Sequence, residues 1–252
     1  MKKLSAVIIT KNEEKNIERC LNSLKWVDEI VVVDSGSQDR TLEICRRFGC
    51  KILETEWLGF GPTKQLAVNA ATHNWVLSID ADEEVTPELQ TEIKTILQQS
   101  QPLNGYRIRW LSYYIKKWVR YSGWNKQYKL KLFNRQYGHF NDSLIHEKVL
   151  LEGPIGKLNH ALKHHTYPDL TTFTRKMDSY AEMGARMLYD QGKKGSLWSA
   201  YIHAMAMFVK MYFLQWGFLD GQVGLILASN YAFAVYYKYL KLWEMTTPAQ
   251  KP

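Results

Sequence analysis

The feature that most constrains the fold of this chain is the alternation of short apolar runs with helical stripes over its first hundred residues. Apolar, strand-like runs occupy residues 4–9, 30–33, 51–53 and 75–79. The segments between them carry apolar residues at helical spacing, as in Ile17, Cys20, Leu21 and Leu24. Strand–helix alternation with continuously apolar strands is typical of a parallel sheet covered by helices on both faces. We therefore expect an α/β fold with a mostly parallel sheet.

Polar side chains follow three of these predicted strands, and the parallel arrangement brings them to one edge of the sheet. They lie in Thr10-Lys11-Asn12, in residues 34–37 with Asp34, and in Asp80-Ala81-Asp82. Because ligands of such sheets bind at the carboxyl ends of the strands, this clustering predicts a binding site. Asp80 and Asp82, at i and i+2, can share one hard divalent cation, Mg²⁺ or Mn²⁺. The alternative is a solvated acidic turn that caps the helix predicted to begin near Pro87.

The composition is that of a folded globular protein with a basic surplus. Hydrophobic residues make up 46% and charged residues 23% of the chain, which excludes a disordered chain, a collagen-like fibre and a disulfide scaffold. The net charge of +8 favours an anionic partner. Because the basic residues are dispersed and an acidic metal pair would repel a phosphate backbone, we expect no nucleic acid. The three cysteines, without metal-type spacing, and the missing signal-peptide pattern predict a cytoplasmic protein with reduced thiols.

Three segments in the first hundred residues resemble family 2 glycosyltransferases, in the correct order. They are residues 4–14, 29–41 and 75–83. The resemblance implies a GT-A fold, a nucleotide-sugar donor and inversion at the anomeric carbon. It also implies nucleotide-binding roles for Thr10, Asn12, Glu13, Asp34 and Lys64, with Asp34 accepting from the uracil ring and Lys64 near the ribose or diphosphate. By the same resemblance, Asp80 faces the ribose and the metal, and Asp82 is the direct metal ligand.

An inverting transfer needs one carboxylate base that takes the proton of the acceptor hydroxyl. Residues 129–147 resemble a segment of a family 2 branch that builds lipopolysaccharide core, and this resemblance makes Glu147 the candidate base. Candidate acceptor-binding residues in the same segment are Lys131, Arg135 and His146. Two alternatives remain at this point: Glu147 is a structural ion-pair partner, or His146 alone faces the ligand.

A later histidine completes the metal shell in some GT-A enzymes, and His165 is our candidate for it. The alternative is a loop histidine with ordinary hydrogen bonds.

The last third of the chain is rich in aromatic residues and is predicted to be helical from about residue 168. We divide the chain into a catalytic domain at 1–165, with a nucleotide-sugar half at 1–100 and an acceptor half at 101–165, and a helical region at 166–252. The charge-free stretches 195–209 and 221–237 are shorter than the ~20 apolar residues of a membrane span. The flanking lysines are Lys193, Lys194, Lys210, Lys238 and Lys241. This pattern suits helices on an anionic membrane surface. The alternative is packing against the catalytic domain or a second subunit, as in a homo-oligomer.

The resulting expectation is a metal-dependent, inverting bacterial enzyme that moves glucose from UDP-glucose to a heptose of the lipopolysaccharide inner core. The acceptor is lipid-linked, so the reaction is expected at the cytoplasmic face of the inner membrane. One rival is another family 2 activity, on a polyprenyl phosphate, capsule or protein acceptor. The other is a non-catalytic nucleotide- or nucleic-acid-binding module.

Overall fold

The computed structural model describes residues 2–124, 127–144 and 147–247. The chain forms two compact units, one made of residues 1–110 and 126–164 and the other of residues 111–125 and 165–252. We had placed the whole of residues 101–165 in the catalytic domain. The segment 111–125 instead packs with the helical region, because its apolar residues belong to the helical core described below.

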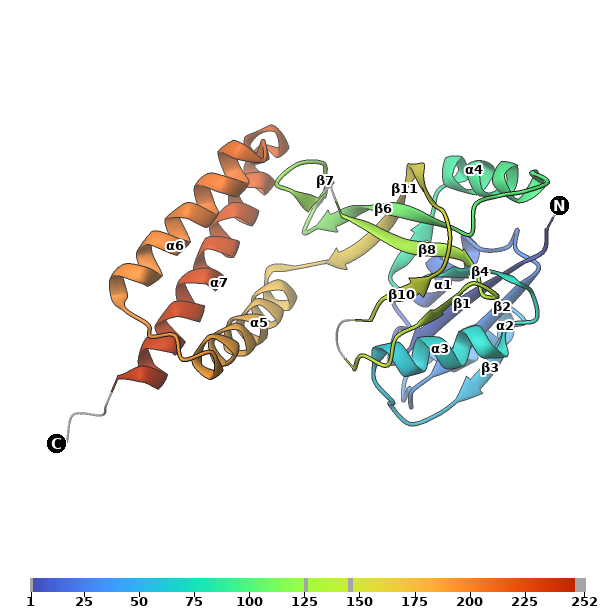
Figure 1. The fold of residues 1–252 in the computed structure, drawn as a ribbon, viewed down its shortest axis with the longest axis horizontal. Helices are drawn as coiled ribbons and strands as arrows, with labels where there is room; N and C mark the ends of the chain where they lie inside the picture. Colours follow the sequence, from blue (N-terminus) through green and yellow to red (C-terminus); the bar gives the residue numbers. More distant parts are fainter. Residues whose placement is uncertain (1, 125–126, 145–146, 248–252) are drawn as a thin grey trace. The chain divides into compact units, whose positions relative to one another are not determined.

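The parallel half of the first unit follows the predicted alternation (Figure 1). Its elements are β1 (Leu4–Thr10), α1 (Ile17–Asn22), β2 (Glu29–Asp34), α2 (Thr41–Arg47), β3 (Lys51–Glu54), α3 (Phe60–Ala70) and β4 (Trp75–Ser78). The strands lie in the order β3-β2-β1-β4, and each neighbouring pair is parallel. The predicted parallel sheet is therefore confirmed for this part, and the ends of β1, β2 and β4 meet at one edge.

The sheet continues with strands that make it mixed rather than parallel throughout. They are β5 (Glu83–Val85), β6 (Gly105–Tyr114), β8 (Tyr128–Asn134) and β11 (Ile155–Tyr167), which extend the order as β4-β8-β6-β11-β5. β8 pairs antiparallel with both β4 and β6, and β5 pairs antiparallel with β11. No crossover helix lies between β6 and β8 among the described residues, so an antiparallel pairing is the one available to them. A separate hairpin pairs β9 (Gly138–Phe140) with β10 (Val149–Leu151).

Two apolar clusters cover the two faces of this sheet. On one face, α1, α2 and α4 (Pro87–Gln98) contribute buried residues such as Leu21, Cys45 and Ile93. On the other face, Ala67 and Val68 of α3 pack on the valines of β1 and β2. Helices on both faces leave the carboxyl edge of the parallel strands as the place where polar side chains gather.

The first turn of α3 packs closely against the chain that precedes β10. The amide of Phe60 donates to the carbonyl of Leu144, and the amide of Gly61 donates to that of Ser143, at 3.1 and 3.0 Å. A Cβ atom at Gly61 would lie 2.0 Å from the carbonyl oxygen of Asn141. Only glycine permits this approach, which brings Lys64, one turn further along α3, close to Glu147.

The second unit is helical and has its own core (Figure 1). α5 (Leu170–Asp190), α6 (Leu197–Val209) and α7 (Gln222–Thr246) are its long helices. The π-helical turn η2 (Lys210–Leu214) and the 3-10 turn η3 (Gly217–Asp220) connect α6 to α7. α7 packs against both α5 and α6. The core includes Tyr114 and Val119, which explains why the end of β6 and β7 (Lys117–Val119) belong to this unit.

The structure changes one expectation for this unit. Helical backbone continues from α6 through η2, across Lys210, so that Leu197–Leu214 forms an 18-residue stretch. By length and composition alone this stretch could cross a membrane, and only 11% of it is buried. We had judged the charge-free stretch too short because we ended it at Val209.

Candidate active site

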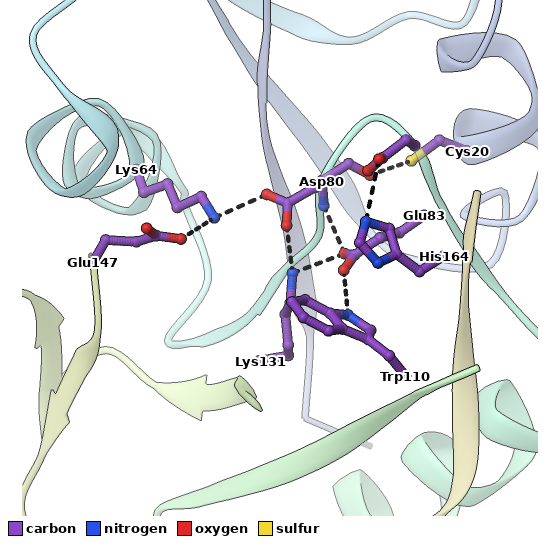
Figure 2. A network of polar contacts seen from close by, with 9 residues as sticks. Cys20, Lys64, Asp80, Glu83, Trp110, Lys131, Glu147 and His164 are labelled. Atoms are coloured by element: carbon purple, nitrogen blue, oxygen red, sulfur yellow. Dashed lines mark hydrogen bonds and ion pairs between the residues drawn. The ribbon is translucent and has the colours of Figure 1, made fainter. Parts of the chain in front are cut away.

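The carboxylate of Asp80, directly after β4, is held by two lysines (Figure 2). Lys64 of α3 lies 2.8 Å from Oδ1, and Lys131 of β8 lies 2.8 Å from Oδ2. Although burial alone would raise it, the pKa of Asp80 lies far below its usual value because the two ammonium groups stabilise the charged form. Both oxygens of Asp80 are therefore engaged by cations of this chain.

Lys64 also reaches the candidate base. Its Nζ donates to Oε1 of Glu147 at 2.8 Å, so one ammonium joins Asp80 to Glu147 (Figure 2). Burial lowers the pKa of Lys64, but the two carboxylates outweigh it and hold that pKa above its usual value. Lys64 is thus a fixed cation between the end of the parallel sheet and the segment that carries Glu147.

Glu83 is the fully buried carboxylate of this network. Its carboxylate accepts from the amide of Asp80 at 2.7 Å, from Nε1 of Trp110 at 2.6 Å and from Nζ of Lys131 at 2.8 Å. Burial raises the pKa of Glu83, while the charge of Lys131 opposes this effect. Glu83 therefore fixes both the turn that carries Asp80 and the indole of Trp110.

Asp82 points toward a histidine of β11. Its Oδ2 lies 3.2 Å from Nε2 of His164, and the imidazole lies tilted against the indole of Trp110 with ring centroids 4.7 Å apart. Burial would lower the pKa of His164, but the contact with Asp82 raises it above the usual value. A carboxylate beside an imidazole is a donor set that suits Mn²⁺ and related ions.

The side chains of Asp82 and His164 fit a metal site in which the substrate supplies the remaining ligands better than a structural metal site, in which the protein supplies them all. Among the described residues, no group of three or more His, Cys, Asp or Glu side chains is arranged to hold a metal ion. Catalytic Mg²⁺ and Mn²⁺ sites commonly use one or two protein ligands and complete their coordination with substrate phosphates. Asp82 and His164 match that requirement, whereas the oxygens of Asp80 already accept from two lysines.

The residues predicted to bind the nucleotide lie at the ends of β1 and β2. Asp34 is buried, and its carboxylate accepts from the amides of Gly36 and Ser37 at 2.9 and 2.8 Å, which shapes the turn after β2. Asn12, in the left-handed region at φ 56°, binds that turn through its side chain and its amide. The hydroxyl of Thr10 is buried and has no hydrogen-bond partner among the residues that the structure describes, as expected of a group that meets a ligand.

Glu13 lies in the same electrostatic environment as the Asp80–Asp82 turn. Burial raises its pKa, and the nearby charges of Asp82, Asp39 and Asp80 raise it further, against a hydrogen bond from Asn16. The ends of β1 and β4 are thus close enough for their carboxylates to interact.

A cavity of about 490 Å³ opens beside this network in the first unit. Its polar and charged lining includes Lys64, Asp80, Arg107, Lys129, Lys131, Glu147 and Lys148, and its aromatic lining includes Trp110, Tyr128 and Phe140. Asp80 and the candidate base Glu147 therefore face one space, although they lie far apart in the sequence.

The structure gives other partners to three of the predicted residues. Arg135 donates to the carbonyl of Val68 at 3.0 Å and so caps the end of α3. Lys131 donates to Asp80 and Glu83 and also lines the cavity that Glu147 lines. The ring of His165 lies against Tyr113 and Trp118 within the helical unit, whereas His164 is the histidine that lies beside Asp82. Our fourth candidate, His146, lies outside the described residues.

Sequence reasoning missed Glu83, Trp110 and His164. Glu83 stands directly after the acidic pair, and its burial depends on pairing of β5 with β11, which no local pattern reveals. His164 and His165 are neighbours on a strand, where successive side chains point to opposite faces. Once the register of β11 is known, the alternating direction of its side chains shows which of the two histidines faces the site.

Comparison with known proteins gives a family and several relatives. The family model described as "Glycosyl transferase family 2" matches residues 5–155. An uncharacterized glycosyltransferase of Rickettsia typhi is 33% identical over 263 aligned residues, which cover 98% of this chain and 88% of the relative. The lipopolysaccharide core biosynthesis glycosyltransferase LpsC of Rhizobium meliloti is 26% identical, over 94% of this chain and 93% of that protein.

Among solved structures, that of TarS residues 1–349 from Staphylococcus aureus is similar to this chain, at 17% identity and a TM-score of 0.48. The alignment covers 96% of this chain and 90% of the TarS chain. That protein has also been crystallised with UDP and with UDP-GlcNAc.

Proposed function

This chain belongs to glycosyl transferase family 2, and we propose that it transfers glucose from UDP-glucose to a heptose of the lipopolysaccharide inner core with inversion. The relationship to LpsC along nearly the whole of both chains supports a lipopolysaccharide acceptor. UDP and UDP-GlcNAc, which are bound in structures of TarS, support a UDP-sugar as the donor class.

The observation that carries the proposal is that Asp80 and Glu147 line one cavity. The nucleotide-binding candidates lie at the parallel strand ends, on the Asp80 side of the network. Glu147 approaches from the segment before β10, on the other side of Lys64. A donor that occupies the strand ends thus places its anomeric carbon between the nucleotide-binding edge and a carboxylate.

In the proposed reaction, Glu147 acts as the general base. Its carboxylate takes the proton of the acceptor hydroxyl, the hydroxyl oxygen forms a bond to the anomeric carbon, and the bond between that carbon and the diphosphate oxygen breaks. UDP leaves with the electron pair of the broken bond. Lys64 keeps Glu147 oriented through Oε1, at 2.8 Å.

A divalent cation fits this site through Asp82 and His164. When bound, it would neutralise charge that develops on the leaving diphosphate.

The proposal is tested with the purified full-length chain. UDP-glucose, UDP-galactose, UDP-N-acetylglucosamine and GDP-mannose are each incubated with a heptose-terminated core acceptor, with and without Mg²⁺ or Mn²⁺. We expect transfer from UDP-glucose that requires the cation and yields the inverted linkage. Transfer to a polyprenyl phosphate that persists in Glu147→Gln would contradict the proposal, because a phosphate nucleophile needs no base.

We further propose that the helical unit binds the cytoplasmic surface of the inner membrane. An apolar stripe along α6 and η2 is largely exposed and includes Trp198, Ile202, Met205, Phe213 and Leu214. Lys193, Lys194 and Lys210 are exposed beside it and complement an anionic leaflet. Two lysines that we expected to contribute have other partners: Lys241 pairs with Asp178 and Glu182, and Lys238 packs its stem against Gly184.

Co-sedimentation with vesicles that contain anionic phospholipid tests this location. Replacement of Trp198, Ile202 and Met205 by Ser should reduce vesicle binding, because each removes exposed apolar surface from the stripe. Lys241→Gln serves as the control and should bind like the parent. If the serine variant binds vesicles as well as the parent, the proposal fails. If the parent is a dimer and the serine variant is not, the stripe is a subunit interface instead.

A further inference from the structure

The cavity beside Asp80 carries more positive than negative side chains. Five of its lining residues are cations, namely Lys64, Arg107, Lys129, Lys131 and Lys148. Two are carboxylates, Asp80 and Glu147. Side chains of one sign in a cleft with apolar walls attract a ligand of the opposite sign.

Two of the five cations are neutralised by the network already described. Lys64 is paired with Asp80 and Glu147, and Lys131 with Asp80 and Glu83, each at 2.8 Å. Both side chains are less than a tenth exposed, so they are fixed parts of the protein. They account for every carboxylate that lines the cavity.

The other three cations have no carboxylate partner among residues 2–124, 127–144 and 147–247. Arg107 forms no ion pair there, Lys129 lies over the ring of Trp110 at 5.7 Å, and Lys148 engages Asn141 through its backbone alone. All three side chains are exposed. Their charges are available to a ligand in the cavity.

All three of these cations line the cavity that Glu147 also lines. Arg107 is opposite Leu130 in the pairing of β6 with β8, and Leu130 also lines the cavity. Lys129 precedes Leu130 on β8, and Lys148 follows the candidate base Glu147. None of the three lies at the ends of β1, β2 or β4, where the donor nucleotide is expected.

We propose that Arg107, Lys129 and Lys148 form an anion subsite that binds a phosphate or carboxylate group of the acceptor, next to the hydroxyl that is glycosylated. This inference rests on the proposed function, because it takes Glu147 to mark the acceptor side of the cavity. An arginine presents a planar fork of donors that matches both anions, and two lysines add charge without a fixed geometry. The enzyme would then select sugars that carry an anionic substituent over neutral sugars.

The diphosphate of the donor is also an anion that these three cations could bind. The first test therefore distinguishes the donor diphosphate from an anionic group of the acceptor. Inorganic phosphate is titrated into enzyme that is saturated with UDP and Mn²⁺, and binding is followed by calorimetry. We expect phosphate to bind to the UDP-saturated enzyme. If phosphate binds only in the absence of UDP, the three cations serve the donor and the proposal is overturned.

The second test uses the variant Arg107→Gln/Lys129→Gln/Lys148→Gln. We expect its phosphate affinity to fall by at least about 10-fold, as charge-assisted hydrogen bonds are lost, while its UDP affinity stays unchanged. A matched control, Lys3→Gln/Arg46→Gln/Lys51→Gln, removes the same charge elsewhere on the unit and should keep the phosphate affinity. Equal loss in both variants would indicate a general charge effect and overturn the subsite.

The two readouts also separate this inference from the proposed function. Phosphate binding needs no turnover, so the subsite can be found in a chain that fails to use UDP-glucose or a heptose. Conversely, active transfer with equal KM values for phosphorylated and dephosphorylated forms of one acceptor would overturn the subsite and leave the proposed function in place.

Discussion

Lys64 and Glu147, 83 positions apart in the sequence, form an ion pair at 2.8 Å, and the same Lys64 ammonium holds Asp80 at 2.8 Å. One buried cation therefore links the carboxylate at the end of the parallel sheet to the candidate base. This contact orients the base, beside the backbone hydrogen bonds from Phe60 and Gly61 to the segment that precedes it.

Glu147→Gln should lower the rate of transfer by about 10²–10⁴-fold, the usual cost of losing a general base. The amide keeps the shape of the side chain and can still accept from Lys64, so UDP affinity should stay at the parental value. Steady-state kinetics together with UDP calorimetry measure both quantities. A variant with parental turnover and weakened UDP binding would remove Glu147 from the role of base.

Gly61→Ala should separate the two halves of the site without touching a charged residue. The new Cβ would lie 2.0 Å from the carbonyl oxygen of Asn141, so the loop before Glu147 must move away from α3. We expect kcat to fall while UDP affinity is retained. Gly49→Ala is the control for loss of a glycine, since its Cβ meets no atom within 4 Å, although the backbone there at φ +70° adds strain of its own.

His164→Ala should reduce Mn²⁺ affinity and slow transfer, whereas His165→Ala should leave Mn²⁺ affinity unchanged. The reason is that only His164 lies beside Asp82. The double variant Asp82→Ala/His164→Ala should lose little more activity than Asp82→Ala alone, because the two side chains would act on the same ion. Strictly additive losses would show that they serve different purposes.

The affinity for Mn²⁺ should increase with pH above about 6.5. Contact with Asp82 raises the pKa of His164, and a protonated imidazole cannot bind a metal. The stability of the metal-free protein should depend on pH in the opposite direction and decrease as the pH rises. The stabilisation from protonated His164 is complete below the unfolded pKa and is lost as the pH rises through the raised folded pKa. Mn²⁺ titrations and thermal unfolding between about pH 6 and 9 measure both trends, and both should flatten in His164→Asn.

Lys131→Met should destabilise the first unit by roughly 3–5 kcal/mol, because it leaves the buried Glu83 carboxylate without its cation. The double variant Lys131→Met/Glu83→Gln should recover part of that loss, since the buried charge is then removed as well. Urea unfolding of the four members of this cycle gives the coupling free energy. Independent, additive effects would contradict the buried pair.

The strands and helices of the first hundred residues, apart from β5, could be read from the sequence because their signals are local. β1, β2 and β4 are continuous apolar runs, and α4 begins at Pro87 with an apolar stripe through Leu89 and Ile93. Parallel pairing then brings the ends of these strands to one edge, so the grouping of Asp34, Asp80 and Asp82 follows from topology.

The partners of those residues were decided by tertiary structure. Glu83 is buried because β5 pairs with β11, and Lys131 reaches it from a strand 48 positions away. The choice of His164 over His165 depends on the register of β11, because a shift of one residue turns each side chain to the opposite face. Local sequence determines which residues form strands and helices. The ion pairs among Lys64, Asp80 and Glu147 exist only once distant segments pack together, since their energy comes from burial that no single segment provides.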